Sequence, residues 1–326
     1  MPSISVTYLG LDMKSPIILS SSSLTNSTNG IRRAADAGAG AVVLKSLFEE
    51  QIKAESAESS EEVDYSSHPE AQEYIEQMGR HLGPESYLKL IADAKSSVNI
   101  PIIASVNCVS PRWWSDYARQ LEIAGADALE LNIAIMPRKG EDPAEVESRY
   151  LGIVDSVRDR VGLPIAVKIG PYFTSLAAFA NALHRAGATA LVLFNRFYQL
   201  DIDVDSAELS PGYQFSTSQE IHTALRWISI LAGESPGELA ASTGVHDGTD
   251  AVKLLLAGAT AVQVCSTVYK NGYERITEMN SSIESWMDAK GHDTIDDFRG
   301  RLAQAGSAEP EAYERLQYIK ALTGLS

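Results

Sequence analysis

Four polar side chains stand at or just after the ends of apolar segments that are typical of buried strands. The segments are AVVLK, ALELN, PIAVKI and ALVLF, and the side chains are Lys45, Asn132, Lys168 and Asn195. A lysine in an apolar segment is costly to bury without an anionic partner. Two such lysines and two asparagines predict a bound group with a polar, electron-accepting edge. An ammonium beside the N1/O2 edge of a flavin stabilises its reduced anion, so a flavin fits this chemistry.

Two strand-to-helix turns near the end of the chain, at residues 242–244 and 265–267, are rich in small and hydroxyl side chains. Between them we expect a helix over residues 247–256, capped by Asp247 or Thr249, and a strand over 260–264. N–H groups at helix N-termini bind phosphate, and the loops after strands seven and eight of a (β/α)8 barrel do so. The turns therefore predict a phosphate site. The alternative is two ordinary turns in which small residues serve only tight packing.

Strand-like and helix-like segments alternate along nearly the whole chain, which is the pattern of parallel strands joined by helical crossovers. Ala-Gly-Ala triplets around Gly38, Gly125, Gly187 and Gly258 mark the joints where a helix ends before the next strand. An open, doubly wound sheet uses similar joints, but eight units and two adjacent phosphate-type turns favour a TIM (β/α)8 barrel. The predicted strands cover residues 16–20, 41–45, 101–106, 128–132, 164–169, 190–194, 238–241 and 260–264.

We expect a single domain over residues 1–326, with a small N-terminal hairpin at 4–14 and a helical C-terminal extension at 271–326. The acidic segment 46–81 follows the second strand and is either a disordered surface loop or a substrate lid. Residues 195–215 carry Asp201, Asp203 and Asp205 but lack the glycine and terminal glutamate of an EF-hand loop. We interpret that segment as a solvated acidic loop.

Composition excludes several classes of function. The chain has 326 residues and a net charge of −16, which argues against nucleic acid or an anionic membrane as a partner. No apolar run approaches the roughly 20 residues that span a bilayer, and the N-terminus does not have the pattern of a signal peptide. The two cysteines, Cys108 and Cys265, form no disulfide framework, and no spacing of histidine and cysteine predicts a metal site. We therefore expect a cytoplasmic protein without a bound metal.

Several segments of the chain resemble the dihydroorotate dehydrogenases, which are FMN-containing β/α barrels of pyrimidine biosynthesis, and especially their soluble class 1 enzymes. The resemblance runs from SPIILSSS to FRGRL and is most specific in VVLKS, ALELN, VKIGPYF and residues 241–272. It implies that Lys168 contacts the isoalloxazine ring and that Lys45 lies beside flavin and substrate. It also implies roles for further residues: flavin or pyrimidine contacts for Asn132 and Asn195, the FMN phosphate for Thr243, Gly244, Cys265 and Ser266, and a place beneath the flavin for Ser20 and Ser21.

The chain departs from the family where the substrate is bound. After ELN the class 1 enzymes continue with a Ser-Cys-Pro-Asn-type loop, whose cysteine removes the substrate proton. This chain has Ile135 at that position, or Met136 if the loop shifts by one residue, and neither side chain accepts a proton. The family's substrate loop Asn-Ser-Met-Gly-Leu-Pro-Asn has no counterpart either. Cys108 follows the third predicted strand and is either a substitute base or a buried thiol that fills space.

Three hypotheses follow from these patterns. The first is an FMN-dependent oxidoreductase of dihydroorotate dehydrogenase type, which transfers hydride between flavin and a small dihydropyrimidine-like substrate; its catalytic residues are Lys45, Asn132 and, as substitute base, Cys108. The second is an FMN barrel that acts on another substrate or has no dehydrogenase activity. The third is an aldolase-like barrel that binds a phosphorylated metabolite and uses Lys168 as a Schiff base. The family resemblance also implies a homodimer, and it leaves the electron acceptor open.

Overall fold

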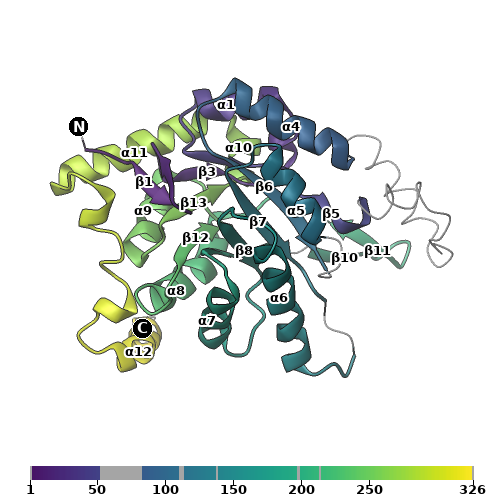
Figure 1. The fold of residues 1–326 in the computed structure, drawn as a ribbon. Helices are drawn as coiled ribbons and strands as arrows, with labels where there is room; N and C mark the ends of the chain where they lie inside the picture. Colours follow the sequence, from purple (N-terminus) through teal and green to yellow (C-terminus); the bar gives the residue numbers. More distant parts are fainter. Residues whose placement is uncertain are drawn as a thin grey trace.

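The computed structural model describes residues 2–51, 83–109, 114–136, 139–196, 199–212 and 214–324. Within these residues, eight parallel strands form a ring that closes through a pairing of β4 with β6 (Figure 1). This arrangement confirms the predicted TIM barrel. In their order around the ring, the strands are β4 (Ala41–Val43), β3 (Ile17–Leu19), β13 (Ala261–Val264), β12 (Glu238–Ser242), β9 (Ala190–Leu193), β8 (Ile165–Ile169), β7 (Ala128–Ile133) and β6 (Ile102–Cys108).

Helices surround the ring of strands, as Figure 1 shows. Each Ala-Gly-Ala joint has its glycine in the left-handed region, with φ between 93° and 119°, so the predicted helix ends are confirmed. Asp247 caps α9 as predicted, since its side chain accepts a hydrogen bond from the backbone N–H of Asp250. The helices are α1 (Thr28–Asp36), α4 (Pro84–Ser97), α5 (Trp114–Ile123), α6 (Pro143–Arg158), α7 (Leu176–Ala186), α8 (Ile221–Leu231) and α9 (Gly248–Ala257).

The N-terminal hairpin is confirmed as the antiparallel pair β1 (Val6–Tyr8) and β2 (Leu11–Met13). After β4, the short strand β5 (Leu47–Phe48) pairs with β6 at Val106 and Asn107, further along the strand to which β4 is paired. Most of the expected loop or lid at 46–81 lies outside the described residues, which end at Gln51 on this side.

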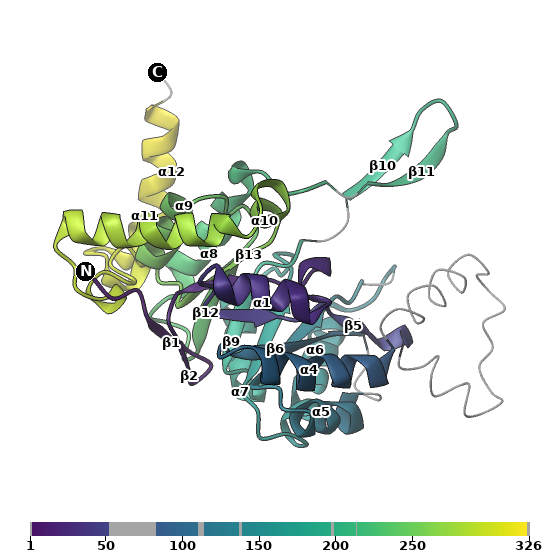
Figure 2. The same cartoon turned by 90° about the horizontal axis from the view of Figure 1, so that it is seen from above.

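The expectation that residues 195–215 form a solvated acidic loop is wrong, because part of this segment has regular β-structure. The segment contains an antiparallel hairpin of β10 (Gln199–Asp203) and β11 (Glu208–Gly212), which reaches away from the barrel in Figure 2. Asp201, Asp203 and Asp205 are exposed on this hairpin. Leu200 and Ile202 are also more than half exposed. Cross-strand pairing orders the backbone here, since no side chain described on the hairpin, over residues 200–210, is buried.

The C-terminal extension is helical, as predicted. It contains α10 (Ser266–Asn271), α11 (Glu274–Lys290) and α12 (Tyr313–Thr323), with short 3-10 turns between α11 and α12. Figure 2 shows α12 projecting from the body of the molecule, and none of its residues is buried. Among the helices described, none combines the length and the apolar character needed to cross a membrane.

Candidate active site

A small polar cavity lies at the carboxyl ends of β3, β8, β12 and β13, where active sites of this fold are built. Its volume is about 90 Å³, which is below the roughly 300–1,000 Å³ of a typical ligand pocket. Eight residues predicted from the sequence line it: Ser20, Ser21, Lys168, Asn195, Thr243, Gly244, Cys265 and Ser266. The described lining is completed by Arg196, Ser216, Ser242, Val245 and Gln263.

Lys168 is buried at the inner end of this cavity, with 6% of its surface exposed. Its Nζ donates hydrogen bonds to Ser20 Oγ at 3.1 Å and to Gln263 Oε1 at 2.9 Å. A carboxylate lies beneath it, because Glu130 Oε1 is 3.6 Å from the same Nζ. The anionic partner that a buried lysine requires is therefore present inside the barrel.

The turn after β12 is held in a strained backbone conformation. Thr243 and Gly244 have φ of 79° and 80°, and a β-branched residue rarely adopts a positive φ. Thr243 Oγ1 donates a hydrogen bond to the carbonyl of Phe194 at 3.1 Å. Gly244 lies so close to the start of α8 that an added Cβ would stand 2.2 Å from the backbone nitrogen of Ile221. The tight turn therefore requires the glycine, as the sequence pattern suggested.

The second predicted phosphate turn is hydrogen-bonded to the segment that follows the first turn and to Ser216. Thr267 Oγ1 at the start of α10 donates to the carbonyl of His246 at 2.9 Å, and Ser266 Oγ accepts a hydrogen bond from Ser216 N at 3.0 Å. Burial lowers the pKa of His246, and the nearby Lys270 ammonium lowers it further. Ser216 and Ser266 line the cavity on this side, and His246 lies behind them, where its Nε2 is 3.2 Å from Ser216 Oγ.

The opposite side of the barrel mouth carries the remaining predicted residues. Asn132 does not line the cavity, but its Oδ1 accepts a hydrogen bond from Asn195 Nδ2 at 2.8 Å. Lys45 is half-buried after β4 and lines none of the described cavities. Ile135 is buried, and its backbone N–H donates to the Tyr150 hydroxyl at 3.3 Å. Met136, the other residue that the resemblance offers for the position of the family's base, is more than half exposed, so an apolar side chain stands at either position.

The structure describes the side chain of Cys265 but not that of Cys108. The backbone of Cys108 forms the last residue of β6, but its side chain lies outside what the structure describes, so its role as substitute base stays a prediction. Cys265 is a free thiol at the N-terminus of α10. Burial raises its pKa, against the opposing effects of a Ser22 hydrogen bond and the Lys168 ammonium. Cys265 is therefore suited to lining the cavity and not to removing a proton at neutral pH.

Four polar residues inside or at the mouth of the barrel were missed by the sequence reasoning. They are Ser105, Asn107, Glu130 and Gln263. Strand register places Ser105 beside Glu130 and Asn107 beside Asn132, so each pair shares a layer of the ring. The available signal was a polar residue in an apolar strand, and for Ser105 and Glu130 a second polar residue two positions further on.

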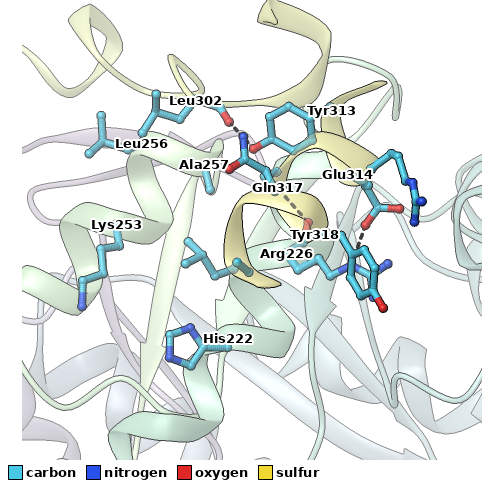
Figure 3. Close-up of a pocket in the computed structure, with 14 residues that line it drawn as sticks. His222, Arg226, Lys253, Leu256, Ala257, Leu302, Tyr313, Glu314, Gln317 and Tyr318 are labelled. Carbon is cyan, nitrogen blue, oxygen red and sulfur yellow. Dashed lines mark hydrogen bonds and ion pairs between the residues drawn. The ribbon is translucent and has the colours of Figure 1, made fainter. Parts of the chain in front are cut away.

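A larger cavity, of about 1080 Å³, lies elsewhere, between α8, α9 and the C-terminal helix α12 (Figure 3). Its described lining includes Leu225, Leu256, Leu302 and Tyr318, and the Arg226–Glu314 ion pair stands at its edge. It is remote from the strand ends where the polar side chains gather. Size alone therefore does not identify the active site in this molecule.

The described residues contain no group of three histidine, cysteine or acidic side chains that is placed to hold a metal ion. What the mouth does contain is a buried ammonium, hydroxyl and amide groups, and two helix-start turns in one cavity. This set of groups defines a β/α barrel whose carboxyl end is suited to an anionic, polar ligand.

Comparison with known proteins agrees with this class. The family model for dihydroorotate dehydrogenase matches residues 3–287. A relative from Methanosarcina acetivorans, named dihydroorotate dehydrogenase B (NAD(+)), catalytic subunit, is 30% identical over 297 residues, which cover 88% of this chain and 92% of the relative. A protein of the same name from Pyrococcus horikoshii is 28% identical over 307 residues, covering 90% of this chain and 96% of the relative.

A third relative, from Aeropyrum pernix, is named putative dihydroorotate dehydrogenase A (fumarate). It is 30% identical over 226 residues, which cover 67% of this chain and 72% of the relative. The chain belongs to the dihydroorotate dehydrogenase family. It is an oxidoreductase of that type.

Proposed function

We propose that the protein binds FMN at the carboxyl end of its barrel and transfers hydride between the flavin and a small dihydropyrimidine-like substrate. The observation that carries the proposal is the place of Lys168. Its ammonium stands in the same cavity as the two turns around Gly244 and Ser266, so one ligand with a phosphate and a polar ring edge can meet both. FMN is such a ligand, and it supplies the hydride chemistry when bound.

The residues of the cavity fit the parts of FMN. The turns around Gly244 and Ser266 supply backbone N–H groups and a hydroxyl for the phosphate. Lys168 supplies positive charge for the ring edge, and Ser20 holds the lysine in place through its hydroxyl. The described cavity is smaller than a whole flavin nucleotide, and the adjoining cavity of about 230 Å³ shares Asn195 and Thr243 with it.

Dihydroorotate is the first substrate to test, because the family of this chain is defined by its oxidation to orotate. In that reaction a base removes a proton while hydride leaves the neighbouring carbon. Ile135 cannot act as that base. A different small substrate that needs no base at this position is therefore the second candidate, and the burial of Ile135 favours it.

The alternative of a Schiff-base aldolase is disfavoured by the surroundings of Lys168. A Schiff base forms on a free amine with an accessible lone pair. The Nζ of Lys168 instead faces Glu130 in an ion pair and donates two further hydrogen bonds. An ammonium held in this way is a charge for binding and electrostatic stabilisation.

The test is an absorbance spectrum of the purified protein, repeated after anaerobic addition of dihydroorotate. Flavin bands that bleach support dihydroorotate oxidation, and Cys108→Ala then tests the substitute base. Flavin bands that persist support a flavoenzyme with another substrate or a flavoprotein without dehydrogenase activity. A colourless protein that takes up no added FMN would refute the proposal.

Three expectations from the sequence remain predictions: a single domain with a lid-like insertion, a homodimer and a cytoplasmic location. The sequence leaves the electron acceptor open. The relatives are named as enzymes that use NAD(+) or fumarate, so these two compounds are the acceptors to test first.

A further inference from the structure

Glu130 is a carboxylate in the interior of the barrel, and 1% of its surface is exposed. It lies on β7 between two buried leucines, Leu129 and Leu131. Burying an ionised carboxylate costs several kcal/mol unless a charge and hydrogen bonds compensate it. The burial of Glu130 therefore requires an explanation, and neither apolar packing nor the predicted phosphate site provides one.

The surroundings of Glu130 point to Lys168. Glu130 Oε1 lies 3.6 Å from Lys168 Nζ, and no other ion pair to this carboxylate forms among the described residues. Gln263 joins the two groups, because its Oε1 accepts a hydrogen bond from Lys168 while its Nε2 donates one to Glu130 Oε2. The three residues come from β8, β13 and β7, so closure of the barrel is what assembles them.

Below Glu130 the barrel offers a hydroxyl but no further positive charge in the described structure. The Tyr8 hydroxyl is buried without a hydrogen-bond partner among the described residues. Burial raises the pKa of Tyr8, and the negative charges of Glu130 and Glu238 raise it further, so this phenol stays neutral. Among the described residues, Lys168 is therefore the cation that pairs with the negative charge of Glu130.

We propose that Glu130 is a positioning residue that holds Lys168 in place and offsets part of its charge, and thereby lowers the reduction potential of the flavin bound above it. This inference rests on the proposed function, since it requires a flavin beside Lys168. It concerns a residue that touches neither substrate nor cofactor. Its effect passes through the ammonium of Lys168 and the amide of Gln263.

The direction of the effect follows from charge. An isolated ammonium beside the flavin ring favours the reduced, negatively charged flavin and so raises the potential. A carboxylate 3.6 Å from that ammonium favours the oxidised, neutral ring, because charges interact strongly inside a protein. Removing the carboxylate charge while keeping its shape should therefore make the potential more positive.

The experiment compares the purified flavoprotein with its Glu130→Gln and Glu238→Gln variants by dye-coupled reductive titration. Glu238 is a matched control, because it is a half-buried carboxylate of the same barrel whose Oε2 accepts a hydrogen bond from the backbone N–H of Leu9 at 2.6 Å. We expect Glu130→Gln to bind reduced flavin at least about tenfold more tightly relative to oxidised flavin. For a two-electron couple that ratio is a positive shift of about 30 mV. Glu238→Gln should leave the potential unchanged.

Each outcome decides the inference. Equal potentials for Glu130→Gln and the unmodified protein, with flavin bound in both, would overturn it and leave the proposed function standing. Failure of the unmodified protein to bind any flavin would overturn both. If Glu130→Gln does not fold, Glu130→Asp keeps the buried charge but shortens the side chain by one methylene, which moves the carboxylate away from the Lys168 ammonium. A more positive potential in Glu130→Asp than in the unmodified protein supports the inference, and equal potentials contradict it.

Discussion

The two sides of the barrel mouth differ in what they offer a ligand. The cofactor side, formed by Ser20, Lys168, Gly244 and Ser266, presents a buried ammonium, hydroxyl groups and two helix-start turns in one cavity. The substrate side, which follows β4, β6 and β7, holds half-buried Lys45 and Asn132 and places buried Ile135 where the family has its base. The comparison teaches that groups suited to an anionic cofactor gather on one side, whereas an apolar side chain stands at the position of the family's base on the other.

The physical reason is the number of groups on which each function depends. Phosphate binding uses several backbone N–H groups, so it depends on the course of two turns and on small residues such as Gly244. Proton removal depends on a single side chain in contact with the substrate. A change at residue 135 alone can therefore remove the base without altering the turns of the cofactor side.

The largest effect is expected for Lys168→Met, which leaves Glu130 as an unpaired buried charge. Breaking a buried ion pair by removing one partner costs about 3–5 kcal/mol. Urea unfolding should show this loss in the free energy of unfolding. Lys45→Met, on the substrate side, is the control and should cost no more than about 1 kcal/mol. Similar losses in both variants would contradict the difference between the two sides.

The next largest effect is expected for Gly244→Ala on the cofactor side. A left-handed backbone costs an alanine about 1–2 kcal/mol, and the added Cβ meets the Ile221 nitrogen at 2.2 Å. Moving the turn should weaken FMN binding at least about tenfold, which is about 1.4 kcal/mol. Gly291→Ala is the matched control, since Gly291 has φ of 71° and open space around its Cβ position. Fluorescence titration should find the affinity of Gly291→Ala for FMN unchanged. An equal loss of affinity in this control would contradict the role of the Gly244 turn in FMN binding.

A pH effect of intermediate size should arise from two histidines. Burial lowers the pKa of His184 and of His246 from the ordinary value of about 6.5. Below pH 6.5 the folded state then binds fewer protons than the unfolded chain, so the free energy of unfolding decreases as the pH falls from 7.5 to 5.5. Thermal unfolding across this range measures the decrease. His246→Asn should reduce the slope, and an unchanged slope would show that this side chain does not contribute.

The smallest effect on FMN binding is expected from a change at residue 135, on the substrate side of the barrel mouth. Ile135→Cys restores the residue type of the family's base and removes buried apolar volume, at a cost of about 1–2 kcal/mol in stability. FMN affinity should stay within about twofold, because the side chain lies outside the cavity around Lys168. Ile135→Val serves as the volume control. A tenfold loss of FMN affinity in either variant would show that the two sides are not independent.

Much of the fold could be predicted from local sequence signals. The Ala-Gly-Ala joints around Gly38 and Gly258 marked helix ends correctly, because a left-handed residue is a local requirement that glycine meets. Asp247 was one of two predicted caps of α9, and the local signal there was a side-chain acceptor just before the helix. The hairpin β10–β11 was missed although its sequence alternates between apolar and acidic residues. Acidic side chains are uncommon in strands, and this hairpin buries no face that would have marked it.

The candidate site was predicted in part. Strand ends indicated Lys168 and Asn195, because a charge or an amide there interrupts an apolar run. Glu130 and Gln263 lie 133 positions apart, and only closure of the ring brings them together around Lys168. No periodicity of a single strand reports a partner on the other side of a barrel. The same holds for the hydrogen bond between Asn132 and Asn195.

The most direct test of the central claim is a paired titration of the flavin-free protein with FMN and with riboflavin, which lacks the phosphate. Because the turns around Gly244 and Ser266 are assigned to the phosphate, we predict one FMN per chain and binding at least about 100-fold tighter than that of riboflavin, a difference of about 2.8 kcal/mol. Equal affinity for the two compounds, or no binding of either, would contradict the assignment of the cofactor side.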